Sequence, residues 1–311
     1  MRRLVLATLL VLAFAGSADA ATEPRVALVI GNSAYQDMPL ANPANDARLM
    51  AKTLRGLGFE VIERIDADQK TMKRAIQEFG ERLEQAGQDG VGLFYFSGHG
   101  VQVGGVNYLI PIDTSINRES DVDIEAVSAN AVLVTMEFAR NRLNIVFLDA
   151  CRNNPYARSF RSAARCLARM DAPRGTLVAY ATAPGGVAFD GEGANSPYTS
   201  ALAQAMQAPG LKVEEAFKQV RLSVMAETGE QQVPWEASSL TGDFYFNPGA
   251  ATAAPAVALP APASMTDTAA TTQQESLFWQ STKDSTDPAM FEAYLEQYPN
   301  GRFAALARIQ L

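Results

Sequence analysis

The sequence has little of what a metal site or a disulfide scaffold needs. It contains one histidine, His99, and two cysteines, Cys151 and Cys166, with no Cys-x-x-Cys pair. Because a zinc site takes several histidine or cysteine ligands, we expect no bound metal and no cofactor. Two cysteines also make no disulfide framework, and a thiol near the only histidine is expected to stay reduced or reactive rather than form a structural bridge.

Long apolar runs are absent as well. No segment reaches the roughly 18 uninterrupted apolar residues that a membrane-spanning helix needs, so we expect no membrane span in the mature chain. Residues 1–20 begin with Arg2 and Arg3, continue with a short apolar run and end in the small-x-small pattern Ala18-Asp19-Ala20. This arrangement predicts a signal peptide cleaved near Ala20, and therefore a secreted or periplasmic protein.

Basic residues are outnumbered by acidic ones. Cleavage after Ala20 removes Arg2, Arg3 and Asp19, a net charge of +1, and changes the formal net charge from −8 to −9. A protein this acidic is not expected to bind nucleic acid by general charge attraction. Peptides or proteins with basic residues are the partners that its charge favours.

Short apolar runs alternate with amphipathic segments through most of the chain. The runs predict strands at residues 25–32, 59–65, 92–99, 145–149 and 175–183, with an edge strand at 243–248. The helical periodicity predicts helices at residues 46–57, 68–83, 131–140, 198–207 and 213–227, the second of them capped by Asp68. Such alternation indicates an α/β fold with a mostly parallel central sheet and helices on both faces.

The C-terminal fifth of the chain has a different composition. Residues 24–248 form the predicted main domain, and residues 249–274 are rich in Ala, Pro and Thr with Asp267 as their only charge, which predicts a linker. Residues 275–311 regain an apolar stripe that includes Phe291 and Tyr294. We expect a small helical hairpin there, too short to be stable without a partner surface, and therefore a protein partner for it.

A histidine and a cysteine follow two of the predicted strands. His99 ends the run at residues 92–99, and Cys151 follows the run at 145–149. Because parallel strands place their carboxyl ends at one edge of the sheet, we expect the two side chains to meet there. A thiol needs a base to become nucleophilic near neutral pH, and an imidazole suits that role. The pattern predicts a Cys/His hydrolase, whereas a structural cysteine and a surface histidine are the ordinary alternative.

Glycines surround the histidine. Gly98, Gly100 and Gly104 superficially suggest a dinucleotide-binding loop, but that fingerprint requires a helix to follow directly. Residues 101–109 instead alternate around Gly104-Gly105, which predicts a hairpin. We interpret the glycines as room for a substrate backbone, with the amides of Gly100 and Cys151 forming an oxyanion hole.

Several motifs in one order resemble the caspase-fold peptidases, the clan of caspases, metacaspases and paracaspases, and most of all the paracaspases. The motifs are Ile30-Gly-Asn-x-x-Tyr35, Asn45-Asp46, Leu93-Phe-Tyr-Phe-Ser-Gly-His-Gly100, Ile110-Pro-Ile-Asp113, Phe147-Leu-Asp-Ala-Cys-Arg152 and Ala179-Tyr-Ala-Thr182. The resemblance spans residues 25–247 and implies a caspase-like three-layer fold. It also implies a cysteine endopeptidase in which Cys151 is the nucleophile and His99 the base.

The residues around the nucleophile depart from those of caspases proper, which carry Gln-Ala-Cys-x-Gly where this chain has Asp149-Ala-Cys-Arg-Asn153. In the Arg-cleaving relatives, acidic residues stand at positions that match Asp149, Asp46 and Asp190. The resemblance therefore implies a pocket for Arg or Lys at P1, since carboxylates bind a guanidinium well. Strand-end solvation, helix capping and a loop turn are the ordinary roles of these three positions.

Two other functions remain open on the sequence. A catalytically idle caspase-like scaffold would bind partners through the tail, and a Cys/His hydrolase of another type would act on small amides or esters. Calcium dependence, known among metacaspases, also remains open, although the chain has no Asp-x-Asp-x-Asp-Gly loop.

Overall fold

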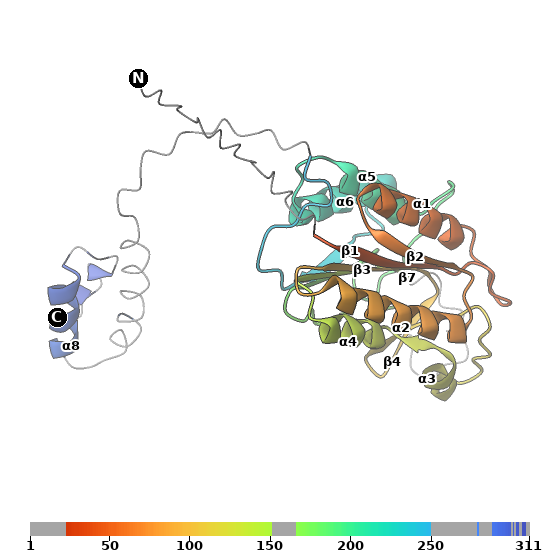
Figure 1. The fold of residues 1–311 in the computed structure, drawn as a ribbon, viewed down its shortest axis with the longest axis horizontal. Helices are drawn as coiled ribbons and strands as arrows, with labels where there is room; N and C mark the ends of the chain where they lie inside the picture. The colour runs from red at the N-terminus through yellow and green to blue at the C-terminus, as the bar shows by residue number, and fades with distance from the viewer. Residues whose placement is uncertain are drawn as a thin grey trace, which may run out of the picture. The chain divides into compact units, whose positions relative to one another are not determined.

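The structure is a computed structural model that describes residues 23–150, 166–249, 279, 288–299, 301, 303, 304, 307 and 308. The chain divides into two units, residues 1–250 and 251–311, which are described separately (Figure 1). Within the described residues no helix is both long enough and apolar enough to cross a membrane. The predicted signal peptide, residues 250–274 of the predicted linker and Cys151 lie outside the described residues.

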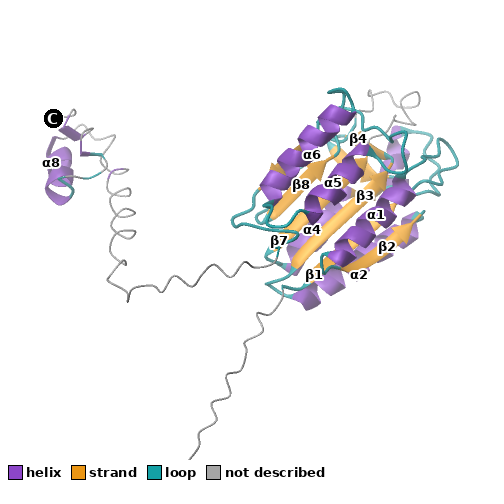
Figure 2. Ribbon diagram, turned by 90° about the horizontal axis from the view of Figure 1, so that it is seen from above, coloured by secondary structure: helices purple, strands orange, loops and turns teal. Residues whose placement is uncertain are grey.

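A six-stranded sheet forms the centre of the first unit. Its strands lie in the order β2 (Glu60–Ile65), β1 (Arg25–Gly31), β3 (Val91–Gly98), β7 (Leu143–Ala150), β8 (Thr176–Tyr180) and β9 (Trp235–Ser238). The first five are parallel to one another, and β9 is antiparallel to β8. Figure 2 shows β3 and β7 running side by side through the middle of the sheet.

Helices cover both faces of this sheet, which confirms the predicted three-layer α/β fold. One face carries α1 (Pro43–Gly56), α5 (Pro197–Gln207) and α6 (Val213–Glu227), and the other carries α2 (Gln69–Ala86) and α4 (Ala129–Ala139) (Figure 1). The layers follow from the period of a strand, whose successive side chains point to opposite faces. Ile145 and Phe147 pack under α5 and α6, whereas Val146 and Leu148 pack under α2 and α4.

A small antiparallel sheet follows β3 directly. It consists of β4 (Gly100–Val103), β5 (Val106–Leu109) and β6 (Val127–Ser128), with η1 (Glu119–Asp121) and α3 (Val122–Glu125) between the last two strands. The turn between β4 and β5 is Gly104-Gly105, with φ of 58° and 85°. These left-handed angles suit glycine, so the predicted hairpin is confirmed.

The structure differs from the sequence prediction at the start of one helix and at the predicted edge strand. Helix α1 begins at Pro43 rather than at residue 46, with Asn42 as its N-cap, and a proline is well suited to a first helical position. Residues 243–248 form no strand; Tyr245 makes one isolated bridge with Lys212, and the edge strand is β9. The carbonyl oxygens of Tyr245 and Phe246 accept hydrogen bonds from Arg25.

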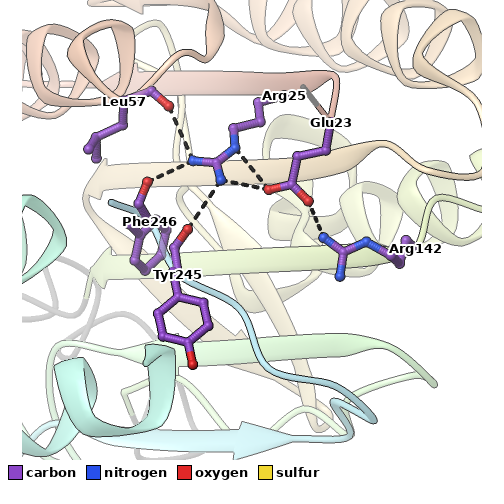
Figure 3. A network of polar contacts seen from close by, with 6 residues as sticks. All are labelled: Glu23, Arg25, Leu57, Arg142, Tyr245 and Phe246. Atoms are coloured by element: carbon purple, nitrogen blue, oxygen red, sulfur yellow. Dashed lines mark hydrogen bonds and ion pairs between the residues drawn. The ribbon is translucent and has the colours of Figure 1, made fainter. Parts of the chain in front are cut away.

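Arg25, the first residue of β1, joins both ends of the domain (Figure 3). Its guanidinium donates to the carbonyl oxygens of Leu57, Tyr245 and Phe246 and twice to the carboxylate of Glu23. Glu23 also pairs with Arg142. The guanidinium lies 5.5 Å from the ring centre of Phe59 and 5.2 Å from that of Phe244. Every N–H of the side chain is therefore used, and these bonds connect β1, the end of α1 and the end of the domain.

The tail unit contains α8 (Pro288–Gln297). Phe291 and Tyr294 are buried in a small cluster with Ala304 and Ala307. The ring of Trp279 stacks on Phe303 at 5.2 Å with an interplanar angle of 4°. The apolar stripe of the sequence thus forms an internal cluster of aromatic side chains within this unit.

Replacing Arg25 by methionine is expected to destabilise the main domain by about 2 to 4 kcal/mol, because three partly buried carbonyl oxygens lose a charged donor. The measurement is urea unfolding of the full mature chain. Arg48→Met is the matched control. Arg48 is exposed, and its one hydrogen bond within the described residues is to Asn45 in its own helical turn, so the change in stability should stay within about 0.5 kcal/mol. Equal losses in both variants would contradict the role of Arg25.

Candidate active site

The candidate site begins where the two central strands end. In the parallel pairing of β3 with β7, Ser97 lies opposite Asp149 and Gly98 lies opposite Ala150. The next residue along the first strand is His99, and the next along the second is Cys151. Both predicted dyad residues therefore follow a directly paired position at the carboxyl edge of the sheet, which is where open α/β sheets hold their sites.

The backbone and the ring of His99 are both fixed. Its amide N–H donates to the hydroxyl of Tyr35 at 2.9 Å, and its carbonyl oxygen accepts from the amide of Ile110 at 3.0 Å. The imidazole Nε2 lies 2.8 Å from the carbonyl oxygen of Met38. A carbonyl oxygen only accepts, so Nε2 carries the proton of this bond, and Nδ1 is the atom that can take up a proton in the neutral ring.

His99 is more buried than the sequence suggests. Although glycines flank it on both sides, His99 is 1% exposed. Residues 38–40 lie over it, and its imidazole lines a cavity of about 290 Å³ together with Val187, Phe189 and Asp190. The imidazole therefore meets a partly apolar cavity rather than bulk water.

Asp46 and Asp149, two of the predicted pocket residues, are brought together by one serine. Ser196 donates its hydroxyl to Asp149 Oδ2 at 2.5 Å and its amide to Asp46 Oδ1 at 2.9 Å. Asp46 also accepts from the side chains of Asn195 at 3.0 Å and Ser97 at 3.2 Å. Both aspartates have no exposed surface. Asp46 thus joins α1 to the start of α5 instead of capping its own helix.

The start of α5 supports the Asp149 carboxylate. Thr199 donates its hydroxyl to Asp149 Oδ2 at 2.8 Å, and its amide donates to the Ser196 hydroxyl at 3.0 Å. The positive end of the helix dipole favours a carboxylate at this position. Burial, followed by the negative charge of Asp149, raises the pKa of the neighbouring Tyr198 hydroxyl well above its usual range.

Asp190 lies on the other side of the site. Its carboxylate Oδ2 accepts from the amides of Ala41 at 2.8 Å and Asn42 at 3.3 Å, and its carbonyl oxygen accepts from the Asn42 side chain. It lines the cavity that contains His99. Asp190 therefore joins the loop after β8 to the loop before α1, and these two loops form opposite walls of the cavity.

Gly100 of the predicted oxyanion hole packs closely against the end of β7. A Cβ added at Gly100 would lie 3.0 Å from the Cβ of Ala150, the residue before Cys151. Cys151 itself falls outside the described residues. The expectation that the two cysteines form no structural bridge is wrong, because Cys166 is disulfide-bonded. In the described part of the chain, no group of three or more His, Cys, Asp or Glu side chains is arranged to hold a metal ion.

Sequence reasoning missed most of the residues that hold the site in place. His99 and the two aspartates are contacted by residues that lie far from them in the chain. These residues are Tyr35, Met38, Ser97, Ser196 and Thr199. Ser196-Pro197 is a local signal for a helix start, with an N-cap serine and a proline at the first helical position. That signal identifies the helix, but not the carboxylate that its serine also contacts.

Comparison with known proteins gives a consistent result. A family model described as "Caspase domain" matches residues 24–245. Mucosa-associated lymphoid tissue lymphoma translocation protein 1 of Homo sapiens is 29% identical over 168 residues, which cover 53% of this chain and 19% of that protein. Caspase a of Danio rerio is 25% identical over 156 residues, 46% of this chain and 37% of that protein. The chain thus spans about a fifth of the length of the human relative.

A solved structure agrees with the fold. The crystal structure of the Drosophila initiator caspase Dronc matches with a TM-score of 0.51 and 16% sequence identity, and the match covers 72% of this chain and 83% of that chain. At this level of identity the likeness concerns the fold alone.

Replacing Ser196 by alanine tests the support of Asp149, because the variant loses the hydroxyl that donates to Asp149 and keeps the backbone amide that donates to Asp46. The variant loses an N-cap, worth about 1 kcal/mol, and a donor to a buried carboxylate, worth about 1.5 to 3 kcal/mol. We expect a fall of about 2 to 4 kcal/mol in the free energy of unfolding. Ser128→Ala, which removes the N-cap of α4 and its bond to the amide of Asn130, should cost about 1 kcal/mol. A smaller loss for Ser196→Ala than for Ser128→Ala would contradict the role of the Ser196 hydroxyl in supporting Asp149.

Proposed function

Because this chain belongs to the caspase-domain family of peptidases, we propose that it is a cysteine endopeptidase in which Cys151 is the nucleophile and His99 the general base. The observation that carries the proposal is the register of β3 and β7. It pairs Gly98 with Ala150, and His99 and Cys151 are the residues that follow them. Among the cysteines and histidines of the chain, these are the two that follow paired positions of neighbouring strands.

The hydrogen bond to Met38 supports the role of the imidazole. With Nε2 donating to the Met38 carbonyl oxygen, the lone pair of Nδ1 is available to accept the thiol proton of Cys151. The same carbonyl oxygen stabilises the imidazolium that results. Met38 thus orients the base in the way that a carboxylate orients the histidine of a serine protease triad.

The proposed reaction starts from the reduced chain, in which Cys151 carries a free thiol, and it has two stages. The Cys151 sulfur attacks the peptide carbonyl carbon while His99 holds the thiol proton, and the amides of Gly100 and Cys151 stabilise the oxyanion. Collapse of this intermediate breaks the C–N bond, and His99 gives its proton to the leaving amine, which leaves a thioester. Water, deprotonated by His99, then hydrolyses the thioester and restores the thiol.

For the substrate, we propose Arg or Lys at P1. Asp46 and Asp149 carry carboxylates next to the carboxyl edge of the central strands, where Ser196 and Thr199 orient them with neutral donors. Neutral donors fix a carboxylate in place without cancelling its charge, so a guanidinium or ammonium gains by entering there. Asp190, which lines the cavity that contains His99, adds a third negative charge to the site. Proteins or peptides with basic residues are therefore the proposed substrates.

The proposal includes export and a partner for the tail. Residues 1–20 have the pattern of a signal peptide, so we assign the mature enzyme to the periplasm or the exterior. The tail unit, with its small aromatic cluster, is proposed to bind another protein. No cofactor enters the proposed reaction, and assays with calcium and with a chelator decide whether the ion has a role.

A scan of P1 residues tests the proposed reaction. Fluorogenic peptides that differ only at P1 are offered to the mature chain in reducing buffer. We expect Arg and Lys peptides to be cleaved with a kcat/KM at least about 100-fold above that of Asp or Ala peptides, which corresponds to about 2.7 kcal/mol of transition-state binding. Cys151→Ala should reduce turnover to background without changing thermal unfolding. Turnover near the wild-type rate in that variant, or turnover of small esters alone, would contradict the proposal.

The same assay tests the pocket. Asp149→Asn keeps the shape of the side chain and an oxygen that can accept from Ser196 and Thr199, but it removes the charge. We expect kcat/KM for the Arg peptide to fall about 10- to 100-fold. Asp243→Asn is the charge-matched control, because Asp243 pairs with Lys212 on the surface. An equal effect of the two variants would reject Asp149 as the P1 residue.

A further inference from the structure

We propose that Tyr35 is a positioning residue that holds His99 in the orientation and tautomer needed for catalysis. The inference rests on the proposed function, in which His99 is the general base. Tyr35 lies in the loop between β1 and α1 and ends the motif Ile30-Gly-Asn-x-x-Tyr35, which has no assigned role so far. It is buried, with 6% of its surface exposed.

The hydroxyl of Tyr35 lies between two segments of backbone. It accepts the amide N–H of His99 at 2.9 Å and donates to the carbonyl oxygen of Ile110 at 3.1 Å. The amide of Ile110 in turn donates to the carbonyl oxygen of His99. Tyr35 and Ile110 therefore fix the peptide groups on both sides of the histidine Cα, and with them the direction in which its side chain leaves the backbone.

The ring of Tyr35 packs against the imidazole itself. The two ring centres lie 4.5 Å apart at an angle of 52°. Met38, three residues further along the same loop, places its carbonyl oxygen 2.8 Å from Nε2. A flip of the imidazole by half a turn would replace Nε2 by a carbon and lose this bond. One short loop thus determines both the plane of the ring and the nitrogen that carries its proton.

Hydrogen bonds fix the loop that contains Tyr35 and Met38, so the loop can keep His99 in one orientation. The side chain of Asn32 donates to the carbonyl oxygens of Ala67 and Ile110 and accepts from the amide of Ala67. The carboxylate of Asp66 accepts from the amides of Ser33 and Ala34. Met38 has a φ of 61°, a left-handed conformation that a residue with a side chain adopts only when its surroundings enforce it.

Gly98 provides independent geometric support. A Cβ added to this residue would lie 2.5 Å from the Tyr35 hydroxyl oxygen, closer than real contacts allow. The first glycine of the Gly-His-Gly motif is therefore needed because the tyrosine hydroxyl occupies the space beside it. The motifs Ile30-Gly-Asn-x-x-Tyr35 and Gly-His-Gly fit together at this contact.

Tyr35→Phe tests the proposal, because it keeps the ring and removes the hydroxyl. His99 is the only histidine, so the imidazole nitrogen signals in an NMR spectrum of the labelled, untagged mature chain belong to it alone. We expect the wild type to carry the proton on Nε2, and the variant to show at least a threefold rise in the Nδ1–H tautomer. In the peptidase assay, kcat should fall about 10-fold with KM within about twofold, since the variant mispositions a base rather than a binding group.

Tyr108→Phe is the matched control. Tyr108 is buried in the same apolar cluster, is 8% exposed, and donates its hydroxyl to Asp123 at 2.9 Å. Removing a tyrosine hydroxyl that has a purely structural role should leave the tautomer ratio of His99 and kcat within about twofold of wild type. Equal tautomer populations in the Tyr35 and Tyr108 variants would overturn the proposal.

The NMR measurement separates this inference from the proposed function. If the wild type cleaves no peptide, the proposed function fails, and the tautomer comparison still decides whether Tyr35 positions His99. If Tyr35→Phe does not fold, Gly98→Ala takes its place, because the added Cβ displaces the tyrosine hydroxyl. The same rise in the Nδ1–H tautomer of His99 is then expected. An unchanged tautomer in that variant would overturn the proposal equally.

Discussion

The parallel pairing of β3 with β7 is the constraint on which the rest of the site depends. It aligns Gly98 with Ala150, the residues that precede His99 and Cys151 in the sequence. A shift of one residue would turn Asp149 away from Ser196 and α5, because neighbouring positions on a strand face opposite sides. Apolar side chains on both faces of these strands, such as Phe147 and Leu148, fix the register.

At the carboxyl edge of the sheet, one buried serine binds two carboxylates. Ser196 begins α5, and it bonds to Asp149 of β7 and to Asp46 of α1. The start of α5 and the proposed substrate pocket thus share one residue, so the stability of α5 and the position of the negative charge depend on each other. Burying two carboxylates costs free energy unless donors or a bound cation compensate them, which explains the density of hydroxyl and amide donors at this end of the sheet.

Much of the fold can be predicted from the sequence, because its signals are local. Apolar runs identify the strands, Gly104-Gly105 the hairpin, and Asp68 the start of α2, where its carboxylate accepts from the amide of Thr71. The site is only partly predictable. Motifs suggest the proposed dyad and the proposed pocket aspartates, but the hydrogen bonds of Tyr35 to His99 and of Ser196 to Asp149 join distant segments and leave no local pattern. Residues 243–248 resemble a strand, and their carbonyl oxygens bind Arg25 instead.

The central claim is that Cys151, activated by His99, accepts an acyl group from a basic P1 residue. Its most direct test is covalent labelling of the mature chain, in reducing buffer, by a peptidyl acyloxymethyl ketone with Arg at P1, followed by peptide mass mapping. The account predicts a single adduct on Cys151 and a rate that falls at least about 100-fold in His99→Ala. Comparable labelling of Cys166, or an unchanged rate in His99→Ala, would contradict it.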